Sequence, residues 1–189
     1  MKTAVPLELA TRLINNGPCV LVTCRHQGID NVFTVSWNMP VSIVPPMVGI
    51  TCVKSNASHA MILESKEFVI NVPEAHLLDQ AFNCGKFSAR DTDKFGKFGL
   101  TPEPGREVAA PSIRECAGQL ECRLLASPAF GDFTVFVGEV VSAYADEDKF
   151  RNGWLPGKAR IVNHYGDELF YVPGELLKAR LAPDAPGKK

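Results

Sequence analysis

A lysine and three short hydrogen-bonding residues lie within five positions of one another, at Lys54, Ser55, Asn56 and Ser58, directly before a short helical run. The lysine supplies a fixed positive charge, the hydroxyl groups supply donors, and the first N–H groups of a helix have no partner within the helix. Together these groups are suited to holding a phosphate. Ser or Asn before a helix is also ordinary capping, so the loop alone leaves both interpretations open.

Two predicted strands position this loop. Residues alternate from Val32 to Asn38, and a strand turns successive side chains to opposite faces. The pattern predicts an apolar face of Phe33, Val35 and Trp37 and a polar face of Thr34, Ser36 and Asn38. Pro45 and Pro46 then break the chain, and the β-branched run from Met47 to Val53 predicts a second strand that ends at the loop.

The rest of the chain alternates short strands with turns and contains few helices. Further strands are expected at residues 19–24, 68–72, 119–125 and 133–144, a hairpin entering a last strand at 164–172, and helices at 7–14, 57–64 and 74–83. This pattern predicts a mainly β protein, a closed or partly closed β-barrel with a few helices. We expect one domain over residues 1–189, with its core at about 10–175.

Two of the later strands carry specific expectations. In the strand at 119–125, Leu120, Cys122 and Leu124 are predicted to face inward and Gln119, Glu121 and Arg123 outward. The segment from Phe133 to Tyr144 is almost entirely apolar, which predicts a strand buried on both sides or one that runs into a subunit interface.

Composition excludes several classes of function. Hydrophobic residues make up 46% of the 189, charged residues 22%, and the formal net charge is −1, which gives no electrostatic basis for binding nucleic acid or an anionic membrane. The sequence predicts a cytoplasmic protein. The six cysteines form no CxxC pair, so no metal site is expected. Cys84, beside Gly85 at a predicted helix end, is the one cysteine whose surroundings suggest contact with a ligand.

The segment from Lys86 to Thr101 mixes phenylalanines with charged residues and glycines. It is too irregular for a strand. One interpretation is a functional or interface loop on a rigid scaffold, and the other is a solvated connector that its phenylalanines fix to the core.

Several of these blocks, taken in order, resemble the FMN-binding split-barrel family, and most closely its flavoredoxin and flavin reductase-like members. The matching blocks are Asn31–Trp37, the Pro45-Pro46 turn, the Lys54–Ser58 loop, Glu67–Asn71 and Ser88–Phe95. The chain contains neither GxGxxG nor GxxxxGK[ST], so a Rossmann turn and a P-loop are both excluded. The resemblance implies a split β-barrel of Greek-key type.

The resemblance also implies a cofactor and partners. It implies FMN bound near the interface of a homodimer, with electrons passing to a flavin, a small acceptor or a redox partner protein. By this resemblance, Thr34, Ser36 and Trp37 line the ring and ribityl chain, and Lys54, Ser55 and Ser58 take the phosphate. The full implied set is Asn31, Thr34, Val35, Ser36, Trp37, Thr51, Lys54, Ser55, Asn56, Ser58, Cys84, Lys94 and Phe95. If Lys54 does not carry the phosphate, Arg90 and Lys94 are the alternatives.

One departure bears on activity. Flavin reductases that resemble this family often have Gly-Asp-His where this chain has Gly138-Glu139-Val140, and that histidine is associated with nicotinamide handling. The resemblance therefore supports FMN binding and electron transfer better than fast NAD(P)H:flavin reductase turnover. No acid or base is demanded by direct hydride transfer, and His164 is the one weak catalytic candidate.

Three functions remain open at this point. The first is an FMN-dependent oxidoreductase that accepts electrons, including hydride from NAD(P)H. The second is a non-enzymatic FMN-binding sensor of the same fold. The third is a small β-barrel that binds no flavin and serves as an assembly scaffold.

Overall fold

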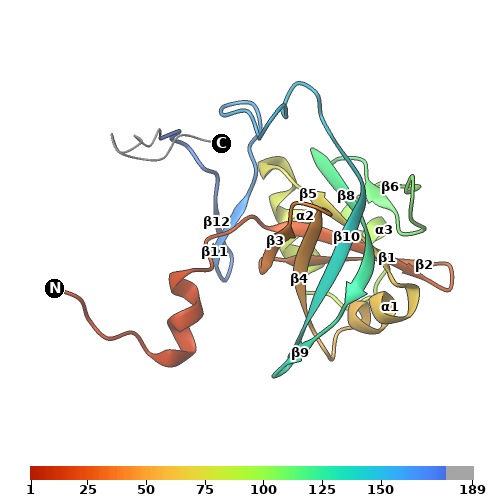
Figure 1. Cartoon of the computed structure of the whole chain (residues 1–189), viewed down its shortest axis with the longest axis horizontal. Coiled ribbons are helices and arrows are strands. Elements are labelled where there is room, and N and C mark those ends of the chain that lie inside the picture. The colour runs from red at the N-terminus through yellow and green to blue at the C-terminus, as the bar shows by residue number, and fades with distance from the viewer. Residues whose placement is uncertain (178–189) are drawn as a thin grey trace.

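The fold is known from a computed structural model, which describes residues 1–177 (Figure 1). One antiparallel sheet of eight strands dominates it, in the order β2-β1-β5-β8-β10-β4-β3, with β9 paired to β10. The strands are β1 (Val20–His26), β2 (Ile29–Val35), β3 (Asn38–Ser42), β4 (Met47–Val53), β5 (Glu67–Val72), β8 (Gly118–Ala126), β9 (Ala129–Phe130) and β10 (Phe133–Ala145). Two small ribbons are separate: β6 (Pro102–Glu103) with β7 (Ser112–Ile113), and β11 (Asn163–Gly166) with β12 (Leu169–Tyr171).

The helices are short. They are the 3-10 helices η1 (Leu7–Leu13) and η2 (Ala75–Leu77) and the α-helices α1 (Ala57–Ser65), α2 (Leu78–Cys84) and α3 (Lys94–Phe98). Within residues 1–177, none is both long and apolar enough to cross a membrane. The mainly β class predicted from the sequence is confirmed.

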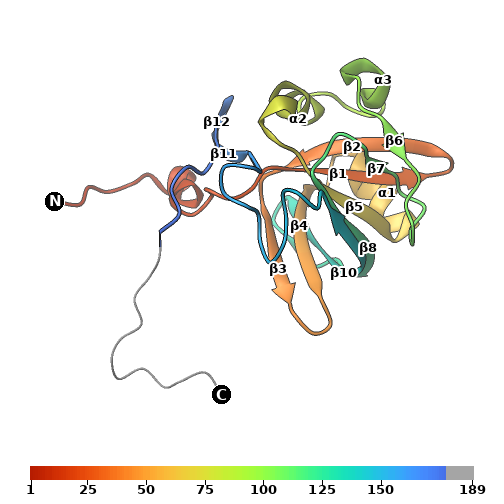
Figure 2. The same ribbon diagram turned by 90° about the horizontal axis from the view of Figure 1, so that it is seen from above.

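Consecutive residues of β1 belong to two different cores, because a strand sends alternate side chains to opposite faces. Val22 packs inside the barrel with Ile50, Phe68 and Phe136, and Leu21 packs outside it. The outer cluster is formed with α2 and α3, which cover the outer face of β1 and β2 (Figure 2). The segment predicted as an irregular loop at 86–101 therefore contains a helix, α3, that belongs to this outer core.

The two ends of the sheet path, β2 and β3, are joined by Ser36 and Trp37. β2 ends at Val35 and β3 begins at Asn38. At this junction Thr51 of β4 donates its backbone N–H to the Trp37 carbonyl at 3.1 Å. Beyond it, β2 and β4 diverge, and neither pairs with the other among the described residues. The barrel is therefore split between β2 and β4.

One predicted side-chain direction is wrong, and two side chains that point out of the barrel as predicted are buried. Trp37 does not continue the apolar face of Phe33 and Val35: the strand has ended, and the indole is 38% exposed. Glu121 and Gln119, predicted outward, are buried at 0% and 8% exposure. The segment that precedes β7 covers their face of β8, and Glu121 accepts backbone N–H groups from Arg106 at 2.8 Å and Glu107 at 2.6 Å.

The terminal segments form an arm beside the barrel. In both ribbon views η1 and the β11–β12 ribbon lie next to each other, away from the main sheet (Figures 1 and 2). Two contacts join its parts: Tyr171 donates its hydroxyl to the Asn16 carbonyl at 3.0 Å, and Arg12 forms an exposed ion pair with Asp167. Its apolar side chains Leu13 and Ile14 are largely exposed.

Candidate functional site

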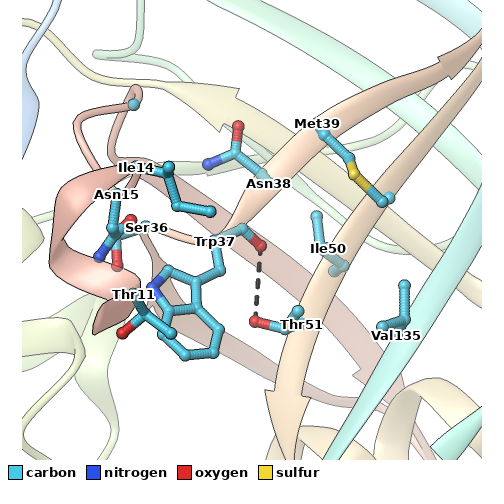
Figure 3. Close-up of a pocket in the computed structure, with 12 residues that line it drawn as sticks. Thr11, Ile14, Asn15, Ser36, Trp37, Asn38, Met39, Ile50, Thr51 and Val135 are labelled. Carbon is cyan, nitrogen blue, oxygen red and sulfur yellow. Dashed lines mark hydrogen bonds between the residues drawn. The ribbon is translucent and has the colours of Figure 1, made fainter. Parts of the chain in front are cut away.

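The split between β2 and β4 contains a groove. Its narrow part, about 180 Å³, is lined by both strands, by Asn56 and by Phe133 of β10. Past Ser36, Trp37 and Thr51 the groove continues into a wider cavity of about 430 Å³, which η1 closes on one side (Figure 3). The volume of the wider part is, by itself, within the range of small-molecule sites.

Backbone groups line this groove because both strands end their pairing there. β2 pairs only with β1 in the described chain, and the pairing of β4 with β3 stops at Ile50. The facing edges of Phe33–Val35 and Thr51–Val53 therefore present strand N–H and C=O groups. Such an edge can form hydrogen bonds to a planar ligand that carries several donors and acceptors, as it would to a neighbouring strand.

An aromatic wall stands at the wide end of the groove. The Trp37 indole stacks on Phe133, with ring centroids 5.2 Å apart and an angle of 26° between planes. Figure 3 shows the indole between Thr11 of η1 and Thr51 of β4. Thr51 also places its hydroxyl 3.5 Å from the Trp37 carbonyl, which fixes the junction against β4.

The start of α1 lies at the narrow end. Asn56 is the N-cap residue, in an extended conformation, but its side chain does not cap the helix. No acceptor among the described residues takes the N–H of Ala57 or Ser58. This helix of nine residues therefore presents free donors and the positive end of its dipole beside the groove.

Two cations lie near the Lys54–Ser58 loop, Lys54 within it and Arg90 from another segment, and they make different contacts. Arg90 donates to the Ser55 carbonyl at 3.0 Å, across 35 positions of sequence, and so lies on the loop. Lys54 instead donates its ammonium to the Gly131 carbonyl at 2.5 Å, and its backbone N–H donates to Asp132 at 3.0 Å. Lys54 thus anchors the β9–β10 turn, and Arg90 is the cation in contact with the loop itself.

Asn31 and Ser58 form a buried polar pair beneath the loop. Asn31 donates its amide to Ser58 Oγ at 2.9 Å, and the residues are 1% and 4% exposed. The Asn31 Oδ1 atom is buried and has no partner among the described residues. An unsatisfied buried acceptor costs about 1–3 kcal/mol, so a donor from a bound molecule would be favourable there.

Lys94 is a further buried polar residue near the Asn31–Ser58 pair. It is 4% exposed, and its ammonium donates to the Cys84 carbonyl at 3.3 Å. Burial lowers the pKa of Lys94, and the neighbouring thiols of Cys84, Cys24 and Cys52 oppose that shift. An ammonium with one acceptor among residues 1–177 retains donors and charge for an anion.

Several predicted site residues make contacts that support the fold. Cys84 is buried, and burial raises the pKa of its thiol to about 11, so the thiol is protonated at neutral pH. Phe95 packs in the outer core. Thr34 donates its hydroxyl to the Ala81 carbonyl, which joins β2 to α2, and Val35 turns its side chain into the barrel core. His164 lies in the arm, where it lines a separate polar cavity.

The structure brings six of the predicted residues to the narrow groove: Thr34, Val35, Ser36, Trp37, Thr51 and Asn56. Sequence reasoning missed Phe33, Cys52, Val53 and Phe133, which line the same groove. Phe133 begins the long apolar strand, but its contact with Trp37 comes from the pairing of β10 with β4. Among residues 1–177 no cluster of His, Cys, Asp and Glu suited to a metal ion is present.

The comparisons with known proteins agree with this geometry. The model of the flavin reductase-like domain matches residues 13–173. The chain belongs to the flavin reductase-like family. It is 34% identical over 188 residues to the uncharacterized protein YddH of Escherichia coli (strain K12), covering 95% of this chain and 100% of that one.

Solved structures show the same fold. The flavoredoxin of Desulfovibrio vulgaris (Miyazaki F) superposes with a TM-score of 0.86 at 25% identity, covering 97% of this chain and 99% of that one. The FMN-binding domain of a flavin reductases-like enzyme from Shewanella baltica OS155 gives a TM-score of 0.80 at 32% identity, with coverage of 94% and 97%. These similarities confirm the split-barrel fold expected from the resemblance.

The residues of the groove fit a flavin mononucleotide in chemical type. The free helix donors and Arg90 suit a phosphate, and the buried Asn31 Oδ1 suits a hydroxyl donor. The strand edges and the Trp37–Phe133 wall suit a planar ring with polar atoms along one side.

Proposed function

We propose that this chain binds FMN in the groove between β2 and β4 and acts as an FMN-dependent oxidoreductase of the flavoredoxin and flavin reductase-like type. It accepts electrons, including hydride from NAD(P)H, and passes them to a free flavin, a small molecule or a redox protein. The observation that carries the proposal is the split itself. It places free strand edges, an aromatic wall and an uncapped helix start along one groove.

Different residues bind the phosphate, the ribityl chain and the ring. The N–H groups at the start of α1, with Ser55, Asn56, Ser58 and Arg90, hold the phosphate. Asn31 orients the Ser58 hydroxyl and accepts a hydrogen bond from the ribityl chain through Oδ1. Lys94 adds a buried positive charge. Trp37 and the edges of β2 and β4 position the ring.

When bound, FMN supplies the two-electron chemistry, and the protein supplies position, exposure and electrostatics. Of the titratable groups near the groove, Lys94 has a pKa lowered by burial, and His59, whose Nε2 lies 2.8 Å from the Thr134 hydroxyl, has one lowered by burial and by Lys54. Neither needs to move a proton, because hydride can pass directly to the ring. The proposal assigns no catalytic acid or base, and a catalytic role for His164 stays a prediction.

Two further expectations accompany the proposal. The protein is a homodimer in which the arm and the β3–β4 turn contact the second copy, since Ile14, Ile43 and Val44 are each more than 85% exposed. The cytoplasmic location expected from the sequence stays a prediction.

The test is an anaerobic titration of the FMN-loaded protein. We expect FMN to bind more tightly than riboflavin, and NADH or NADPH to bleach the flavin absorbance. Bleaching by dithionite but by neither nicotinamide would favour an FMN-binding sensor. A protein that takes up no FMN at all would refute the proposal and favour the scaffold.

A further inference from the structure

A third cavity, of about 320 Å³, adjoins the groove through Thr34 and Ser36, which line both. Three separate parts of the chain supply its polar walls. Arg12 comes from η1, Lys86 follows α2, and His164 and Asp167 come from the β11–β12 ribbon. We call it the Arg12–Lys86 cavity.

This cavity has an excess of positive charge. Its lining contains two permanent cations and one carboxylate, and the pair that Arg12 makes with Asp167 is long and exposed, at 3.3 Å with side chains 50% and 71% exposed. Such a pair contributes little and is easily exchanged for another anion. Lys86 makes no ion pair within residues 1–177.

The fold holds Arg12 in place against the ribbon. Gly166 has a φ of +153°, and a Cβ built there would lie 2.5 Å from Arg12 Nη1, so the guanidinium packs directly on the backbone of the turn. A planar guanidinium offers parallel donors that match a carboxylate or a phosphate.

Aromatic rings form the other wall. Phe82 and Phe170 meet edge to face, with centroids 6.3 Å apart, and the His164 ring lies 5.0 Å from Phe170. The Lys86 ammonium lies over the Phe82 ring, 4.8 Å from its centroid. The cavity therefore combines flat apolar surface with cations, which suits a small aromatic anion.

We propose that the Arg12–Lys86 cavity binds the carboxylate or phosphate of an aromatic molecule that exchanges electrons with the flavin. The proposal rests on the proposed function, because the cavity opens at Ser36 onto the part of the groove assigned to the ring. A molecule held by its anionic group at Arg12 and Lys86 lies in the cavity that shares Thr34 and Ser36 with the groove. The charge excess makes the protein select anions over neutral molecules of the same shape.

The experiment uses the FMN-saturated protein and three probes with one ring and different head groups: benzoate, phenyl phosphate and neutral benzamide. Binding is followed by the change in flavin absorbance. We expect one or both anions to bind at least about tenfold more tightly than benzamide. The preference between benzoate and phenyl phosphate identifies the head group. Equal affinity for benzamide and both anions overturns the proposal.

Variants locate the binding. Arg12→Gln and Lys86→Gln should each lower the affinity for the preferred anion about tenfold and leave the affinity for benzamide unchanged. Lys97→Gln is the matched control, since Lys97 also lies over a phenylalanine, Phe87, at 4.0 Å but away from the cavity. A loss in Lys97→Gln equal to that in Lys86→Gln would show non-specific charge attraction and overturn the proposal.

Asp167→Asn should strengthen anion binding, a result that misfolding would not produce. Asp167 has a φ of +53°, which asparagine tolerates, and its removal frees Arg12. We expect the preferred anion to bind about threefold more tightly. Unchanged or weaker binding contradicts the assignment to Arg12.

The FMN dissociation constant is measured for every variant. If Arg12→Gln or Lys86→Gln weakens FMN as much as the anion, these cations serve the flavin and the proposal is overturned. If the wild-type protein takes up no FMN, the proposed function fails separately. Calorimetry with benzoate and phenyl phosphate then tests whether the cavity still prefers anions; equal heats for benzamide would exclude it.

Discussion

Asn31 of β2 donates its side-chain amide to Ser58 Oγ in the first turn of α1, at 2.9 Å, and both residues are buried. The pair joins the strand edge of the groove to the helix start that we assign to the phosphate. Since Ser58 accepts this bond, its own hydroxyl hydrogen points away from Asn31 and can be donated to a ligand. Strand and loop are thereby parts of one site.

Ser58→Ala should weaken FMN about tenfold, because it removes a hydroxyl donor to a charged phosphate. The affinity for riboflavin, which has no phosphate, should fall much less. Equilibrium titration with both flavins measures the difference. Ser65→Ala is the matched control, since Ser65 lies at the other end of the same helix and contacts Glu67. A similar loss in both variants would place the effect in helix stability.

Arg90→Ala should weaken FMN about ten- to a hundredfold and leave riboflavin nearly unchanged, because Arg90 is the cation that contacts the loop. Lys54→Ala is the informative companion. The resemblance implies that Lys54 takes the phosphate, whereas its ammonium lies on the Gly131 carbonyl. If Lys54→Ala costs more FMN affinity than Arg90→Ala, the original assignment is right and Lys54 turns toward the phosphate on binding.

Local pattern predicted the elements around the site well. The strand from Met47 to Val53 was expected at its observed bounds, because β-branched residues between two prolines and a polar loop leave few alternatives. The turn between β1 and β2 is a hairpin in which Gln27 and Gly28 both have positive φ. The helix after Asn56 was also expected.

Contacts between distant segments were not predictable in this way. Period-2 alternation placed Glu121 outward, since no local signal shows that the segment before β7 will cover that face. Alternation also continued through Trp37, although the strand ends two residues earlier. The position of Arg90 on Ser55 depends on how α2 and α3 pack on β2, which requires the whole fold.

Trp37 should report flavin binding directly. Its indole lines both parts of the groove, so a bound flavin should quench its fluorescence. The chain has two tryptophans, and Trp154 packs against Phe150 outside the groove, with centroids 5.2 Å apart. FMN should quench most of the emission of Trp154→Phe, in which Trp37 is the emitter, and little of that of Trp37→Phe. The reverse result would show that the flavin ring does not bind beside Trp37.

The protein should sediment as a homodimer at micromolar concentration. Apolar side chains of η1 and of the β3–β4 turn are exposed, including Leu13 at 68% and Ile43 at 89%. Ile43→Glu should shift the protein toward monomer. Leu125→Glu, at a residue 53% exposed near the end of β8, is the control and should not. A wild-type monomer by analytical ultracentrifugation, with FMN bound, would exclude this expectation.

Glu121→Gln should lower the free energy of unfolding by about 2–3 kcal/mol, because hydrogen bonds to a buried carboxylate are strong and an amide offers one acceptor oxygen. Besides Arg106 and Glu107, Glu121 accepts from the Val108 N–H at 3.2 Å and the Tyr144 hydroxyl at 3.1 Å. The control is Glu67→Gln, since Glu67 accepts a single N–H from the same segment, at Ala109. That variant should lose under about 1 kcal/mol.

The same carboxylate should make stability depend on pH. Burial alone raises the pKa of Glu121, but the hydrogen bonds from the Arg106, Glu107, Tyr144 and Val108 groups outweigh it, and the pKa in the folded state is lowered from the ordinary 4.5. The unfolded chain therefore binds the proton first as pH falls below 4.5. The stabilisation from Glu121 is complete above that pH and is lost as pH falls through the lowered value. Urea unfolding at a series of pH values should give wild type a steeper decline below pH 4.5 than Glu121→Gln. Parallel curves for the two proteins would show that Glu121 is not the group responsible.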